Sequence, residues 1–204
     1  MNLLTQGTNS LVKRLPIHRP RSAIVKNILY ANTALFGYYL LASGPGKLRF
    51  QRTFTAAPNS SIESLLYFHF AHTSILQFLF TSGVFYTIGN YHVAAYGCTS
   101  FMRIFGASAL GGSLLTAIGL RTGASTEAQA GAMAPAAGLI TYNVFRNPGW
   151  FKLFLRPVPL LAALTLYGAF YGDRAAFGGI SLGYLAFLFG LWKTNKPIVE
   201  ICLT

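Results

Sequence analysis

An apolar run of the sequence reads TSFMRIFGASALGGSLLTAIGL and covers residues 99–120. It carries one charged residue, Arg103, which we expect to extend toward the lipid surface or to be paired. A hydrocarbon core about 30 Å thick needs about 20 helical residues, because an α-helix rises about 1.5 Å per residue. The stretch therefore predicts a helix that spans a membrane.

Five further segments on either side approach the same length. They are residues 27–43, 62–88, 127–145, 151–171 and 174–192. Pro157 and Pro159 fall within 151–171 and predict a delayed or kinked start for that helix. The sequence thus predicts an all-α, polytopic bundle of six transmembrane helices over residues 27–193.

The composition supports a membrane protein. Apolar residues make up 53% of the chain and charged residues only 10%. A soluble domain usually carries about 25% charged residues. The deficit is explained if much of the surface faces lipid.

The charge is strongly basic, with 16 Lys and Arg against 4 acids, and no acid precedes Glu63. Nucleic-acid binding would also explain a basic chain. Here the basic residues lie mostly between apolar segments, and no aromatic–basic binding module is visible. We therefore favour anionic lipid and the membrane potential as the explanation, and expect no nucleic-acid partner.

The basic residues also suggest a location and an orientation. Residues 1–26 form a basic, acid-free arm, which fits an uncleaved mitochondrial targeting segment or, alternatively, a plain juxtamembrane arm. One side of the predicted bundle carries this arm with Arg146, Lys152, Arg156, Lys193 and Lys196, and the other carries Lys47, Arg49, Arg52, Arg121 and Arg174. The bias places both termini, including the short tail 194–204, on the inside, meaning the matrix or the cytosol. With the targeting-like arm, we expect the matrix side of the mitochondrial inner membrane.

Local signals predict the connections. Gly44, Pro45, Gly46 and Pro58 predict that residues 44–61 form the longest loop. Thr126 and Gln129 have capping-box spacing, with Glu127 between them, at the expected start of the fourth helix. The two cysteines, Cys98 and Cys202, are far apart and predict neither a disulfide framework nor a metal site.

Three short motifs lie in the second, fourth and sixth segments. The second reads YFHFAH at 67–72 and continues to Gln77, Thr81 and Gly89. The fourth reads GAMAP at 131–135 and the sixth reads AAFGG at 175–179. Small residues let helices approach closely. We expect such packing inside the domain, rather than with an external partner, at Gly131, Gly138, Gly178, Gly179 and Gly183.

In order and separation these motifs resemble the rhomboid superfamily, and look closest to its mitochondrial, presenilin-associated branch. Rhomboid proteases carry His-x4-His-x3-Asn, Gly-x-Ser-Gly and Ala-His-x-Gly-Gly-x3-Gly in these helices. The first motif is matched by His72, Gln77 and Thr81, which stand at the oxyanion region. Met133 stands at the nucleophile position and Ala176 at the general-base position. The Trp-Arg pair of many rhomboid first loops is absent from residues 44–61.

The resemblance implies a protein that is not an enzyme. A rhomboid protease needs a serine hydroxyl to attack and a histidine to take its proton. A thioether has no proton to give, and a methyl group cannot act as a base, so Met133 and Ala176 cannot form the dyad. Two other hydroxyls, Ser82 and Ser181, lie in no nucleophile motif and show no spacing that pairs them with a histidine.

The substitutions also suggest how the interior is filled. If the helices cross as in rhomboids, Met133 fills the space that Ala176 leaves, which roughly conserves core volume. His72 has two interpretations, a proton or substrate path or a neutral histidine bonded to a first-loop carbonyl. We favour the second.

We therefore expect a non-catalytic, rhomboid-like structural subunit of a multi-subunit mitochondrial inner-membrane complex. Respiratory complexes, ATP synthase and the import machinery are possible hosts. The alternative is an inactive rhomboid that binds transmembrane clients or assists protein translocation. The expected partners are other membrane subunits and anionic lipid. No metal and no cofactor are expected, although bound phospholipid such as cardiolipin is compatible with the basic surface.

Overall fold

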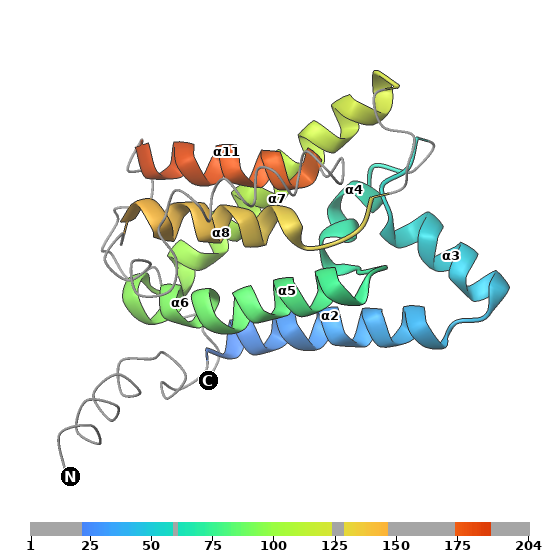
Figure 1. Cartoon of the computed structure of the whole chain (residues 1–204), viewed down its shortest axis with the longest axis horizontal. Helices are drawn as coiled ribbons and strands as arrows, with labels where there is room; N and C mark the ends of the chain where they lie inside the picture. Colours follow the sequence, from blue (N-terminus) through green and yellow to red (C-terminus); the bar gives the residue numbers. More distant parts are fainter. Residues whose placement is uncertain (1–21, 59–60, 124–128, 147–173, 189–204) are drawn as a thin grey trace, which may run out of the picture.

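The protein is described here by a computed structural model of residues 22–58, 61–123, 129–146 and 174–188. Within these ranges the regular structure is helical, and one isolated bridge joins Ala56 to Gln129. The predicted all-α class is confirmed (Figure 1). The predicted fifth segment, 151–171, lies outside the described residues, as do the tail 194–204 and most of the arm.

The helices follow one another in a simple order. In chain order they are α2 (Ala23–Leu41), α3 (Gly44–Phe54), α4 (Ser64–Tyr67), the 3-10 turn η2 (Phe68–Phe70), α5 (Ile75–Val84), the π-helical turn η3 (Phe85–Gly89), α6 (Asn90–Tyr96), α7 (Cys98–Arg121), α8 (Met133–Arg146) and α11 (Arg174–Leu188). Within the described ranges, α7 is the helix long and apolar enough to cross a membrane, and α11 is a shorter apolar helix. The helix predicted at residues 99–120 is thus observed as α7.

The second predicted segment, 62–88, is not one helix. It is interrupted at residues 71–74, and then α5, η3 and α6 continue without a gap as far as Tyr96. The break has a tertiary cause, because the Phe68 carbonyl accepts a hydrogen bond of 2.8 Å from the Gly131 N–H, far along the chain. His92, which lies beyond the predicted second segment, is on helix α6.

The prediction of a loop over residues 44–61 is wrong in part, because helix α3 occupies Gly44–Phe54. Pro45 lies in the first turn of this helix, where a missing N–H costs nothing. The predicted capping box is not at the start of α8, since Gln129 pairs through its backbone with Ala56 and α8 begins at Met133. Thr126 and Glu127 lie outside the described residues.

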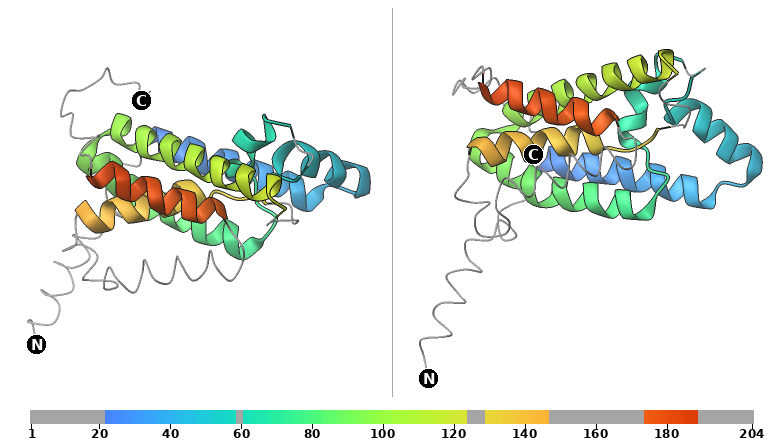
Figure 2. Two further views of the ribbon diagram at one scale, coloured as in Figure 1. Left: turned by 90° about the horizontal axis from the view of Figure 1, so that it is seen from above. Right: turned by 45° about the horizontal axis from the view of Figure 1, so that its top comes forward.

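Helices α8 and α11 pack with their backbones in contact. A Cβ added at Gly179 would overlap the carbonyl of Ala134, and one added at Gly183 would meet the carbonyl of Gly138. Because the residue numbers of the contacting positions rise together on the two helices, α8 and α11 run parallel. Figure 2 shows them beside α7 in both further views.

Helix α7 runs antiparallel to both of these helices. A Cβ at Gly112 would overlap the side chain of Ala134, and one at Gly138 would overlap Ser108. The residue numbers of the contacting positions therefore fall along α7 as they rise along α8. On a neighbouring face of α7, Gly178 has the same close contact with the backbone of Gly111. Helices α7, α8 and α11 therefore form a three-helix core held by small residues.

A second layer consists of α2 and the α5–η3 helix. The rings of Phe36 and Phe78 stack at 4.5 Å between their centroids, and a Cβ at Gly89 would contact Val25. These two contacts make α2 and α5 antiparallel. Because α5 and η3 also contact α8, this layer covers the side of the core opposite α11 (Figure 1).

A single methyl group should distinguish a core glycine from a surface one. We expect Gly179→Ala to lower the free energy of unfolding by about 1–3 kcal/mol or more, because the Ala134 carbonyl leaves no room. Gly106→Ala is the matched control on α7, since nothing lies within 4 Å of the added Cβ. It should be neutral or raise stability by up to about 1 kcal/mol. Reversible unfolding in detergent micelles measures both, and equal stabilities would contradict the α8–α11 contact.

Candidate functional site

The site to which the sequence points lies where α5 approaches the start of α8. Gly131 has φ of 125°, a conformation that L side chains rarely adopt. Its N–H donates to the Phe68 carbonyl, and the Gln77 amide occupies the space that a Cβ would need. A glycine is thus required at this position by its backbone and by its neighbour.

His72 and Thr81 lie at the same junction, and both are fully buried. The Thr81 hydroxyl donates to the Gln77 carbonyl at 2.9 Å and lies 3.5 Å from His72 Nε2. His72 Nδ1 has no hydrogen-bond partner among the described residues, so the predicted bond to a first-loop carbonyl is not seen there. Instead the ring packs edge-on against Phe78.

Met133 and Ala176 are both buried, with 2% and 0% of their surface exposed. Met133 is the first residue of α8, and Ala176 lies about one turn before Gly179 on α11. Since Gly179 contacts Ala134, the two positions are on helices that meet at this level. Neither side chain can carry a proton at the pH of a cell, so the pair can contribute packing but no proton transfer.

The five glycines of the predicted packing set have defined places. Gly138, Gly179 and Gly183 lie between α8 and α11, Gly178 lies against α7, and Gly131 lies against Gln77. All five are therefore in contact with other parts of this chain.

A polar cluster that sequence reasoning missed joins α6, α7 and α8. His92 Nε2 lies 3.0 Å from the Ser100 hydroxyl, and His92 Nδ1 lies 3.2 Å from Asn143 Oδ1. Asn143 Nδ2 lies 3.1 Å from the same His92 Nδ1 and also donates to the Leu139 carbonyl at 2.7 Å, so the whole amide group is held against the histidine. The order serine–histidine–asparagine resembles a nucleophile, a base and its orienting group.

The burial of this cluster indicates a structural role. His92 and Asn143 are fully buried and Ser100 is 7% exposed, with the rings of Tyr96 and Tyr142 packed against the histidine. The cluster satisfies polar groups that would otherwise be costly among apolar helices. The available signal was a histidine and an asparagine in otherwise apolar segments, but their pairing depends on three separate helices.

A second histidine makes a similar link. His69 Nε2 lies 2.9 Å from the Ser113 hydroxyl, and that hydroxyl donates to the Leu65 carbonyl. This contact ties the α4–η2 segment to α7. In the described part of the chain, no group of three or more His, Cys, Asp or Glu side chains could hold a metal ion.

Comparison with known proteins adds no relative, because no protein-family model and no curated protein matches the chain. The rhomboid resemblance therefore depends on the three sequence motifs alone.

A double-mutant cycle tests whether Met133 and Ala176 share one space. Met133→Ala should lose about 2–5 kcal/mol of stability by leaving a cavity, and Ala176→Leu about 1–3 kcal/mol by overpacking. The double variant should be about 0.5–3 kcal/mol more stable than the sum of the two single losses predicts, because the leucine side chain enters the cavity left by Met133→Ala. Unfolding in micelles measures the four states. Additive losses would contradict the shared space.

The buried histidine cluster gives a separate expectation. Asn143→Ala removes the partner of His92 Nδ1 and should lower the free energy of unfolding by about 1–3 kcal/mol. Ser181→Ala is the control, because this serine is exposed, and should change stability by less than about 0.5 kcal/mol. If both variants unfold like the wild type, the cluster does not stabilise the fold.

Proposed function

We propose that the chain is a non-catalytic, rhomboid-like structural subunit of a multi-subunit assembly in the mitochondrial inner membrane. The observation that carries the proposal is the pair of buried apolar side chains, Met133 and Ala176, on helices in direct contact. In a rhomboid protease these positions hold the reacting serine and histidine. Here both side chains are apolar and enclosed, so they can contribute packing but no proton transfer.

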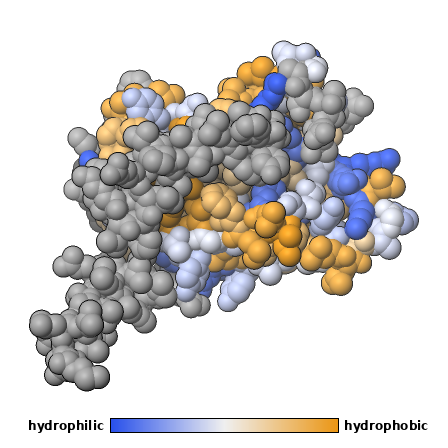
Figure 3. Space-filling model, in the orientation of Figure 1, coloured by the Kyte–Doolittle hydropathy of each residue, from blue (hydrophilic) through white to orange (hydrophobic). Residues whose placement is uncertain are grey.

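A membrane location is supported by the apolar outer face of α7. Met102, Leu110, Leu114 and Ile118 are 43–61% exposed and recur on one face of this helix. Exposed apolar patches of this kind mark contact with lipid or with other proteins. Figure 3 shows a further apolar area over the outer layer formed by α2 and α5.

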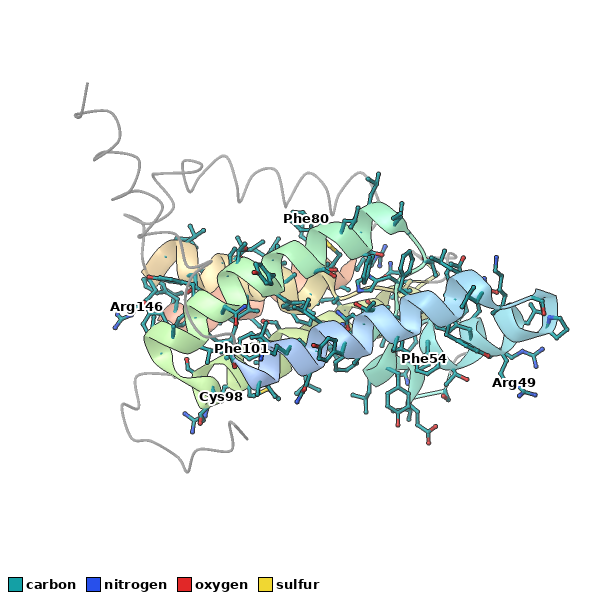
Figure 4. All side chains as sticks on the ribbon, turned by 90° about the horizontal axis from the view of Figure 1, so that it is seen from below. Arg49, Phe54, Phe80, Cys98, Phe101 and Arg146 are labelled. Carbon is teal, nitrogen blue, oxygen red and sulfur yellow. The ribbon has the colours of Figure 1, made fainter. Side chains whose placement is uncertain are left out.

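The two ends of the molecule support the same location. Figure 4 places Arg49 and Arg146 at opposite ends of the long axis, with Phe80 and Phe101 between them. Aromatic side chains gather at each end, around Phe50 on α3 and around Tyr142 on α8. Aromatic belts with basic residues beyond them are typical of helices placed across a bilayer.

The helix directions support a rhomboid-like six-helix bundle. Helices α8 and α11 run parallel to each other and antiparallel to α7, as expected of the fourth, sixth and third spans of the predicted bundle. Arg121 and Arg174 lie at one end with α3, and Arg146 lies at the other. These positions agree with the two groups of basic residues from which the positive-inside rule predicts that both termini lie in the matrix.

Native purification tests the proposed function. A tagged chain extracted from mitochondria in mild detergent should migrate in a large complex with other subunits in fixed stoichiometry. Serine-reactive fluorophosphonate probes should not label it, with an active rhomboid protease as the positive control. A chain that runs alone at its monomer mass would refute the structural role and favour transient binding of transmembrane clients.

A further inference from the structure

Helix α3 is held firmly against the end of α2. Phe50 is 1% exposed and lies between the rings of Tyr38 and Tyr39, at 5.9 and 5.3 Å between centroids. The Lys47 ammonium lies 5.4 Å from the centroid of the Tyr39 ring, within the range of a cation–π contact. Because these contacts fix the inner face of the helix, its outer face is fixed as well.

That outer face combines positive charge with apolar surface. Arg49 and Arg52 are exposed, and Leu48, four residues before Arg52, is 59% exposed on the same face. At the neighbouring end of α2, Leu40 and Leu41 are 60% and 89% exposed. Figure 3 shows hydrophilic and hydrophobic residues side by side in this region.

No acidic side chain of the described residues neutralises this face. Neither α2 nor α3 contains an acid, and the acid in the described ranges is Glu63. Neither Arg49 nor Arg52 is paired with it. A partner that suits the surface must therefore bring negative charge, and it must also offer apolar groups to Leu40, Leu41 and Leu48.

We propose that α3 is a binding site for an anionic phospholipid, in which Arg49 and Arg52 contact the headgroup phosphate and Leu48 lies against the acyl chains. Phospholipids carry both charge and hydrocarbon, whereas free phosphate or a nucleic-acid backbone gives the exposed leucines nothing to contact. The rings of Tyr38, Tyr39 and Phe54 cluster around Phe50 behind this face, and aromatic side chains of this kind are enriched where membrane proteins meet lipid headgroups. This inference rests on the membrane location in the proposed function and adds the lipid class and its residues.

Native mass spectrometry of the purified full chain tests the site. The chain in mild detergent is titrated with phosphatidylglycerol or with phosphatidylcholine of the same acyl chains. We expect preferential retention of phosphatidylglycerol, and binding roughly ten- to thirtyfold weaker in the Arg49→Gln/Arg52→Gln variant. The control is Arg121→Gln/Arg146→Gln, which removes the same charge from two exposed arginines outside α3, one at each end of the molecule, and should bind like the wild type.

A third variant separates lipid from free phosphate. Leu48→Gln should weaken phosphatidylglycerol binding, and inorganic phosphate at the same concentration should not displace the lipid from the wild type. The proposal is overturned if the two double variants bind phosphatidylglycerol alike, if phosphate competes fully, or if Arg49 and Arg52 instead retain a protein or a nucleic acid.

Failure of the lipid-site proposal can be distinguished from failure of the proposed subunit role. A chain that alkaline carbonate releases from membranes refutes both proposals. A membrane-resident chain that migrates alone, but loses lipid only in Arg49→Gln/Arg52→Gln, refutes the subunit role and supports the lipid site.

Discussion

The structure depends on the close approach of α7, α8 and α11. In lipid, burying apolar surface gives helices little reason to associate, and van der Waals contact between closely spaced backbones supplies much of the attraction. Gly112, Gly138 and Gly179 allow that approach, because a Cβ at any of them would overlap a neighbouring helix. The path of these three helices, and the place of every residue between them, follows from this constraint.

Close packing also determines the chemistry of the interior. With α8 and α11 in backbone contact, Met133 and Ala176 are enclosed, and neither can move a proton. The polar groups nearby are used to join elements. His69 reaches Ser113 on α7, and His92 links α6 to α7 and α8. Buried polar side chains thus specify which helices meet, in a core where apolar packing alone is not very selective.

Much of the fold could be predicted from the sequence because it follows from local pattern. The apolar run at 99–120 predicts a helix by its length and composition alone, and it is observed as α7. The spacing of small residues in the fourth and sixth segments likewise predicted close helix packing from local sequence. Ser108 and Gly112 show this spacing in the third segment too, and they were available to predict the α7–α8 contact.

Residue type and spacing alone were enough to predict the all-α class, the apolar helix at residues 99–120, the small-residue faces and the absence of a titratable side chain at Met133 and Ala176. Tertiary structure alone decided the break at residues 71–74, the Ser100–His92–Asn143 cluster and the register of α8 against α11. The break follows the hydrogen bond from Gly131 to the Phe68 carbonyl, and the cluster needs three helices. These features depend on partners distant in the chain, which no local pattern specifies.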